Sequence, residues 1–130
     1  MRWRPSVTAL FVIAAIYDGA VGLMFLFAPA WAFERFGVTP PNHFGYVQFP
    51  AALLLVFAWM FIQVALRPIE NRLLIPYAVM LKAAYCGVVF YYWVTTDLPA
   101  MWKPFAVADL LFAALFVAAY RVVGGRRRTG

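Results

Sequence analysis

Three ionisable side chains stand inside long apolar stretches of this sequence: Asp18, Lys82 and Asp109. A charge in the middle of a lipid bilayer costs about 2.5–3.5 kcal/mol on insertion scales, so such residues usually face other helices and pair with one another. We therefore expect Lys82 to lie between the two acids in one contact network. With both acids ionised, the cluster would hold one negative charge in excess, which leaves open that one acid is protonated.

Two interpretations of this cluster stay open. It can be a functional polar centre that moves a proton or holds the polar end of a ligand. It can also be a structural ion pair that fixes which helices touch and in what register. Tyr17, Tyr77 and Tyr85 could add hydroxyl groups to the centre, and Tyr85 lies one helical turn from Lys82 on the same face. Tyrosine is equally common as a packing residue.

The residue types that most enzymes and metal sites need are scarce. His43 is the only histidine and Cys86 the only cysteine. Haem ligation by two histidines of one chain and an intrachain disulfide are therefore excluded, and a metal site is not expected. The sequence has no catalytic or nucleotide-binding motif of the common kinds. It predicts no cofactor, and it favours a non-enzymatic protein while leaving an enzyme open.

Composition indicates where the chain resides. Hydrophobic residues make up 66% of the chain and charged residues 12%, with a mean hydropathy of +0.82. Soluble domains have about 25% charged residues. A soluble protein of 130 residues could not hide so much apolar surface, because small domains expose a large share of their residues. The chain is predicted to be an all-α integral membrane protein, a four-helix bundle forming one domain over residues 1–130.

Apolar stretches over residues 6–27, 47–66, 74–94 and 104–123 are each about long enough to cross a bilayer, which takes roughly 20 residues. Prolines support their boundaries: Pro5, Pro50, Pro76 and Pro104 are expected in or just before a first helical turn. The first stretch resembles a secretory signal, but Asp18 interrupts it and it is longer than such signals usually are. It is predicted to remain as the first helix.

A rise of ~1.5 Å per residue gives the depth of each buried charge. It places Asp18 about 18 Å, Lys82 about 12 Å and Asp109 about 21 Å from the inner ends of their helices. All three positions fall within the middle of a hydrocarbon layer about 30 Å thick.

Lysine and arginine predict the orientation, because they are enriched in cytoplasmic loops. One side has the arginines at positions 2, 4, 67, 72, 121, 126, 127 and 128, whereas the other has only Arg35 and Lys103. Both termini are thus predicted to be cytoplasmic, and residues 28–46, with His43, to lie outside. The net charge of +6 is then explained by topology, so no nucleic-acid partner is expected. Arg126, Arg127 and Arg128 could also bind anionic lipid.

Three pairs of small residues predict close helix packing: Ala15 with Gly19, Ala83 with Gly87, and Ala114 with Ala118. Small residues four apart let two membrane helices approach each other. The aromatic residues Trp31, Phe33 and Phe36 predict that part of the long outer segment lies along the membrane surface.

The layout resembles the DoxX-like family of small four-helix bacterial inner-membrane proteins. The likeness rests on an arginine before the first helix, the Gly19–Gly22 region followed by Pro29, and Lys103-Pro104-Phe105 leading into residues 107–112. It implies location in a bacterial inner membrane. The family includes subunits associated with quinone-linked sulfur oxidation, but the resemblance carries over no catalytic residue.

Three functions are compatible with these observations. The first is a non-enzymatic assembly or accessory protein that associates with a membrane partner or with copies of itself. The second is a carrier of protons or a small solute that uses Asp18, Lys82 and Asp109 as its polar path. The third is a protein or enzyme that binds an apolar molecule such as a quinone or lipid. A pocket between helices with polar groups only at its base would favour the third function.

Overall fold

The computed structural model describes the backbone of residues 3–129 and the side chains of residues 5–124. Within that range the chain is helical and has no β-strand. The long helices are α1 (Trp3–Phe27), α3 (Gly45–Leu66), α4 (Ile75–Thr95) and α5 (Lys103–Thr129). Shorter elements connect them: α2 (Pro29–Arg35) and the 3₁₀ turns η1 (Arg72–Leu74) and η2 (Ala100–Trp102).

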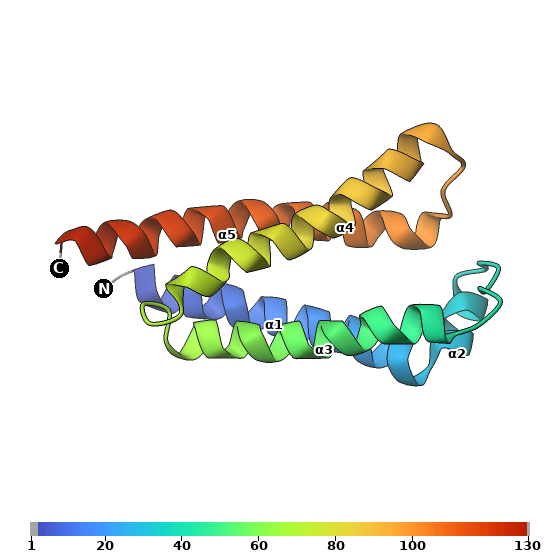
Figure 1. Ribbon diagram of the computed structural model, residues 1–130, viewed down its shortest axis with the longest axis horizontal. Helices are drawn as coiled ribbons and strands as arrows, with labels where there is room; N and C mark the ends of the chain where they lie inside the picture. Colours follow the sequence, from blue (N-terminus) through green and yellow to red (C-terminus); the bar gives the residue numbers. More distant parts are fainter. Residues whose placement is uncertain (1–2, 130) are drawn as a thin grey trace.

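The long helices form two pairs. Helix α1 packs along α3, and α4 packs along α5, whereas contacts between the two pairs are much sparser. In Figure 1 the α1–α3 pair lies below the α4–α5 pair, and both chain ends are at the left. Toward the right, α4 rises away from α3. The two pairs are therefore closest at the end of the molecule that contains the termini.

All four helices predicted from the sequence are present, with boundaries within a few residues of those expected. Pro5, Pro76 and Pro104 lie in first turns, as expected. The prediction for Pro50 is wrong, because α3 begins at Gly45 and Pro50 lies inside it. Proline has no N–H, so it cannot donate the usual helical hydrogen bond to the carbonyl of Tyr46.

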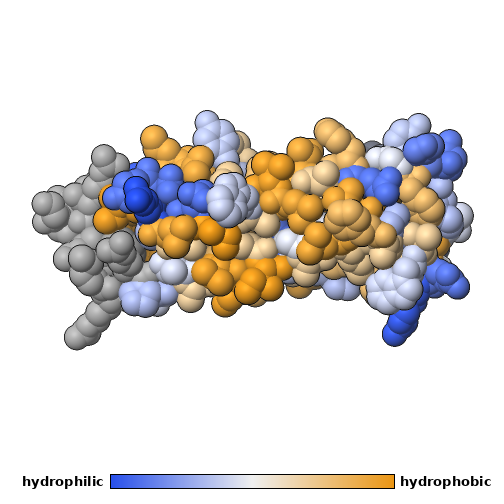
Figure 2. Space-filling model, turned by 90° about the horizontal axis from the view of Figure 1, so that it is seen from below, coloured by the Kyte–Doolittle hydropathy of each residue, from blue (hydrophilic) through white to orange (hydrophobic). Residues whose placement is uncertain are grey.

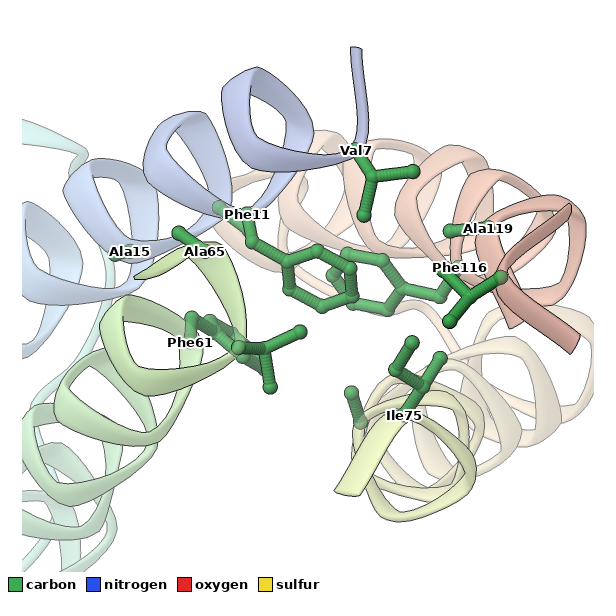
Figure 3. Close-up of a cluster of buried hydrophobic side chains, with 12 residues drawn as sticks. Val7, Phe11, Ala15, Phe61, Ala65, Ile75, Phe116 and Ala119 are labelled. Carbon is green, nitrogen blue, oxygen red and sulfur yellow. The ribbon is translucent and has the colours of Figure 1, made fainter. Parts of the chain in front are cut away.

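The end near the termini is filled by a hydrophobic core. Phe11 of α1 and Phe116 of α5 are stacked with ring centroids 4.7 Å apart, and Phe61 of α3 lies 5.4 Å from Phe116. Figure 3 shows these rings packed together, with Ile75 of α4 beside them. All four of these side chains are fully buried. This core, which we call the termini-side core, is where both helix pairs meet.

A second, smaller core closes the opposite end. It contains Phe25 of α1, Phe33 of α2, Ala51 of α3 and Met101 of η2, with Trp102 packed against it. Helix α2 thus contributes one buried face, since Ala32 and Phe33 are buried whereas Trp31 and Phe36 are exposed. Residues 28–46 are thus partly packed onto the bundle, and the exposed side chains of Trp31 and Phe36 remain available to a membrane surface.

The surface of the long helices is apolar. Four segments are long and apolar enough to cross a membrane: Pro5–Phe27, Gly45–Leu66, Arg72–Thr95 and Ala100–Gly124. Figure 2 shows apolar side chains across the middle of the molecule and hydrophilic ones mainly toward its two ends. Large side chains such as Ile16, Trp59 and Leu111 are more than half exposed. Such a surface is stable in lipid rather than in water, as in an integral membrane protein.

Of the three predicted pairs of small residues, one lies where two helices pack and two are exposed. Ala15 and Gly19 of α1 face α3, where the Cβ atom that an alanine would add at position 19 would lie 3.8 Å from Ala58. The other two predictions are wrong for this single chain. Ala83 and Gly87 are exposed on α4, and Ala114 and Ala118 are exposed on α5. These two pairs therefore point outward from the single chain.

Candidate functional site

The structure brings the three buried charges together, as the sequence predicts. Lys82 Nζ on α4 donates hydrogen bonds to Asp18 Oδ1 on α1 at 2.6 Å and to Asp109 Oδ1 on α5 at 3.0 Å. The side chains of Lys82 and Asp18 are 1% and 3% exposed, and that of Asp109 is 13% exposed. The cluster joins three helices, and it connects the α1–α3 pair to the α4–α5 pair.

Aromatic rings surround the ammonium group of Lys82. Its Nζ atom lies 5.4 Å from the ring centre of Tyr17, 5.7 Å from that of Phe61 and 5.3 Å from that of Phe112. The negative faces of such rings attract a cation, and the effect is larger where water is excluded. Two of the three N–H groups of Lys82 are already used by the carboxylates. Lys82 is thus enclosed and neutralised within the cluster.

The two aspartates are less completely satisfied. Asp18 Oδ2 is buried and has no hydrogen-bond partner among the described residues. Asp109 accepts a hydrogen bond from Lys82 through Oδ1, while its side chain keeps the largest exposed fraction of the three. A carboxylate has about four lone-pair positions. The acceptor capacity of the cluster therefore exceeds its supply of donors.

A cavity of about 430 Å³ lies directly beside the cluster. Asp18, Lys82 and Asp109 are the charged residues among its described lining. They stand on the termini side of that lining, because Asp18 precedes Phe25 along α1 and Asp109 follows Phe105 along α5. The remaining walls are mostly apolar and come from all four long helices and η2: Val21, Phe25, Val47, Pro50, Ala51, Leu53, Leu54, Phe57, Leu81, Ala84, Trp102 and Phe105, with Tyr17, Tyr46 and Tyr85. This is a pocket whose charged groups lie only at its base.

The cavity opens to the side of the molecule. Its lining includes exposed residues of two helices that do not pair: Tyr46 and Leu53 of α3, which are 71% and 41% exposed, and Ala84 of α4. In Figure 1, α4 separates from α3 toward the end of the molecule opposite the termini. In a bilayer this opening would face the acyl chains, because both helices are membrane-spanning candidates.

The tyrosines predicted as accessory groups have different positions. Tyr17 and Tyr85 line the cavity, and the Tyr85 hydroxyl donates a hydrogen bond to the Trp102 carbonyl at 3.0 Å. Tyr77 is 58% exposed and does not line the cavity. Cys86 is buried and donates from Sγ to the Ala106 carbonyl at 3.3 Å, which ties α4 to α5.

Sequence reasoning found the charged base but missed the walls. Val21 and Phe25 follow Asp18 at helical spacing on α1, and Phe105 precedes Asp109 by one turn on α5. Residues three or four apart share a helix face. Residues one or two turns away from each buried charge, on the same helix face, could therefore have been predicted as the walls. The contribution of α3 has no such signal, because α3 has no buried charge.

His43 and the polar ends take no part in this site. His43 is exposed, and its Nδ1 atom accepts a hydrogen bond from the backbone N–H of Gly45 at 2.9 Å, at the start of α3. No group of side chains able to hold a metal ion is found among the described residues. The side chains of Arg2, Arg4, Arg126, Arg127 and Arg128, which contribute to the predicted orientation, lie outside the described ones.

Comparison of this chain with protein-family models, with curated proteins and with solved structures found no match.

Proposed function

We propose that this protein binds an apolar or amphiphilic small molecule, such as a quinone or a lipid, that enters the cavity from the bilayer. The observation that supports this function is the cavity whose charged residues, Asp18, Lys82 and Asp109, all lie at its base. Its volume of about 430 Å³ is within the usual range for small-molecule sites, which is roughly 300–1,000 Å³. The apolar walls would hold the body of the ligand, and the base would hold its polar end.

The proposed setting is a bacterial inner membrane with both termini in the cytoplasm. The arginine-rich ends and the turn with Arg67 and Arg72 would then be inside, and α2 with Glu34 and Arg35 outside. In this orientation the cavity lies in the outer half of the membrane, on the far side of the charge cluster from the cytoplasm. Ligands would reach it laterally from the outer leaflet.

The arrangement of the helices favours a closed-ended site over a transport path. Between the charge cluster and the termini, Phe11, Phe61 and Phe116 fill the space where the helices meet. A proton or solute moving inward would have to cross this layer of fully buried aromatic rings. We therefore consider a carrier function less well supported than ligand binding.

Native mass spectrometry of the protein released gently from its own membrane tests this proposal. We expect a small molecule to remain bound at a fixed ratio. The variant Ala84→Trp should reduce its occupancy at least about tenfold, because the indole would occupy the mouth of the cavity, where Ala84 lines the wall.

Ala20→Trp is the matched control. Ala20 is an exposed alanine of α1 that does not line the cavity. It should leave the occupancy unchanged. A wild-type protein that binds no small molecule, or equal occupancy in both variants, would contradict the proposed function.

Self-association is a second candidate, supported by the outward-facing pairs of small residues. Ala83 and Gly87 on α4, and Ala114 and Ala118 on α5, have the spacing of helix-packing surfaces and lie exposed in the single chain. A protein of the assembly class would use such faces to contact a copy of itself or another membrane protein. A strictly monomeric mass in the same native spectra, without any associated chain, would count against this candidate.

A further inference from the structure

We propose that the ligand of the cavity has an uncharged polar end that donates a hydrogen bond, namely a hydroxyl group, to the carboxylates of Asp18 and Asp109. This inference rests on the proposed function and narrows it from an apolar molecule in general to alcohols, phenols and quinols. It follows from which hydrogen-bonding groups the base of the cavity still has available.

The base offers acceptors. Asp18 Oδ2 has no hydrogen-bond partner within the described part of the chain, although the side chain is 3% exposed. Asp109 uses Oδ1 toward Lys82 and is the most exposed member of the cluster, at 13%. A buried acceptor left without a donor costs free energy, and more so when it is charged. A donor on the ligand would remove this cost.

An anionic end does not fit this base. Among the described residues, Lys82 is the only cation lining the cavity, and it already lies 2.6 Å and 3.0 Å from two carboxylate oxygens. Its side chain is 1% exposed. A carboxylate or phosphate placed there would meet two negative groups before it met the ammonium. Like charges in an apolar surrounding repel strongly, so fatty acids and phosphates are disfavoured.

A second cation is also disfavoured, for a different reason. A group that bonds to the free oxygen of Asp18 lies within about 8 Å of Lys82 Nζ, because both oxygens belong to one carboxylate. An ammonium would therefore be repelled by Lys82 and would have lost its water shell in an apolar cavity. A hydroxyl donates the same kind of hydrogen bond at a much smaller desolvation cost.

Four probes with the same naphthalene body test this inference: 2-naphthol as the donor, 2-methoxynaphthalene without a donor, 2-naphthoate as the anion and 2-naphthylmethylammonium as the cation. Their binding to the protein in lipid nanodiscs is measured by naphthalene fluorescence, with empty nanodiscs subtracted to remove partitioning into lipid. Hydrogen bonds to charged groups contribute about 1.5–3 kcal/mol, so 2-naphthol should bind about ten- to a hundredfold more tightly than its methyl ether. The anion and the cation should bind more weakly than 2-naphthol.

Variants test whether Asp18 and Asp109 cause the preference for 2-naphthol over its methyl ether. Asp109→Asn and Asp18→Asn each replace one carboxylate by an amide of the same shape, whose NH₂ group donates. Each should reduce the preference for 2-naphthol over its methyl ether to within about threefold. Asp97→Asn changes an exposed acid after α4 that does not line the cavity, and should leave the preference intact. A purely structural role of the aspartates would weaken all probes alike without changing their order.

The outcomes separate this inference from the proposed function. If the ether, the anion or the cation binds as tightly as 2-naphthol, and Ala84→Trp abolishes this binding, the hydroxyl inference is overturned. The cavity then remains a ligand site. If no probe binds in a manner that Ala84→Trp abolishes, both are overturned. The affinities of the wild-type protein for the four probes test the hydroxyl inference even where a variant fails to fold.

Discussion

Lys82 is the residue on which the charge cluster depends. It donates hydrogen bonds to two carboxylates that come from different helices, and it is itself fully buried. Removing either acid leaves a cation with one anionic partner. Removing Lys82 instead leaves two acids facing each other in an apolar surrounding. The three members of the cluster are therefore unequal in their effect on stability.

We predict that Lys82→Met lowers the free energy of unfolding by about 3–5 kcal/mol, because breaking a buried ion pair leaves an uncompensated charge. Asp18→Asn should cost about 1 kcal/mol, since the amide oxygen can still accept from Lys82. Unfolding of the purified protein in mixed micelles, titrated with a denaturing detergent and followed by circular dichroism, measures both.

Lys103→Met is the control for loss of a lysine in general. Its Nζ atom lies 5.0 Å from the ring centre of Trp93, near the end of the bundle, so the loss should be within about 1 kcal/mol. If Lys82→Met is as stable as Lys103→Met, the cluster does not hold the helices together.

At the scale of the helices, α1 and α3 approach each other closely at Gly22. A Cβ atom added at Gly22 would lie 2.8 Å from the Ala51 carbonyl oxygen and 3.1 Å from the Leu54 Cβ atom. Both are firmly held parts of α3 and cannot give way easily. This approach also places Ala51 and Leu54 in the cavity wall, opposite α4 and α5.

Gly22→Ala should therefore destabilise the protein by about 1–3 kcal/mol, the usual cost of overpacking. Gly87→Ala is the matched control on α4, where an added Cβ would meet nothing within 4 Å. Because alanine favours a helix over glycine by up to about 1 kcal/mol, this control should be neutral or slightly stabilising. Equal losses in the two variants would show that α1 and α3 do not approach closely at Gly22.

At the scale of the whole molecule, orientation decides which leaflet the cavity opens to. The turn between α3 and α4 contains Glu70, and the connection between α4 and α5 contains Asp97; both residues are exposed. These two positions lie at opposite ends of α4. A reagent that cannot cross the membrane distinguishes between them.

We predict that, in intact cells, an impermeant maleimide labels Asp97→Cys but not Glu70→Cys, each made in a Cys86→Ala background. Glu70→Cys should react only after the membrane is permeabilised, because positively charged connections stay in the cytoplasm. The reverse pattern would place the cavity in the inner half of the bilayer, and labelling of both positions in intact cells would contradict a span between them.

By itself, the sequence determined that the chain forms four long apolar helices and which charged residues of those helices meet. The reason is that a bilayer requires a minimum helix length and makes an isolated charge costly in free energy. The length of an apolar stretch and an ionisable residue within it can therefore be recognised without a structure. Lys82 is the only basic residue near the middle of a predicted span, since Arg121 stands two residues before the end of the last one, and Lys82 is therefore the expected partner of Asp18 and Asp109. The N-terminal bounds of α1, α4 and α5 followed from proline for a similarly local reason.

Only the tertiary structure decided that these charges form the base of a cavity. The cavity exists because α4 separates from α3 beyond the cluster, and this depends on how two helix pairs cross. Pro50 and the pairs Ala83–Gly87 and Ala114–Ala118 were misjudged for the same reason. Whether a residue begins a helix, faces a neighbour or faces lipid is set by the packing of distant segments, and spacing along one helix does not contain that information.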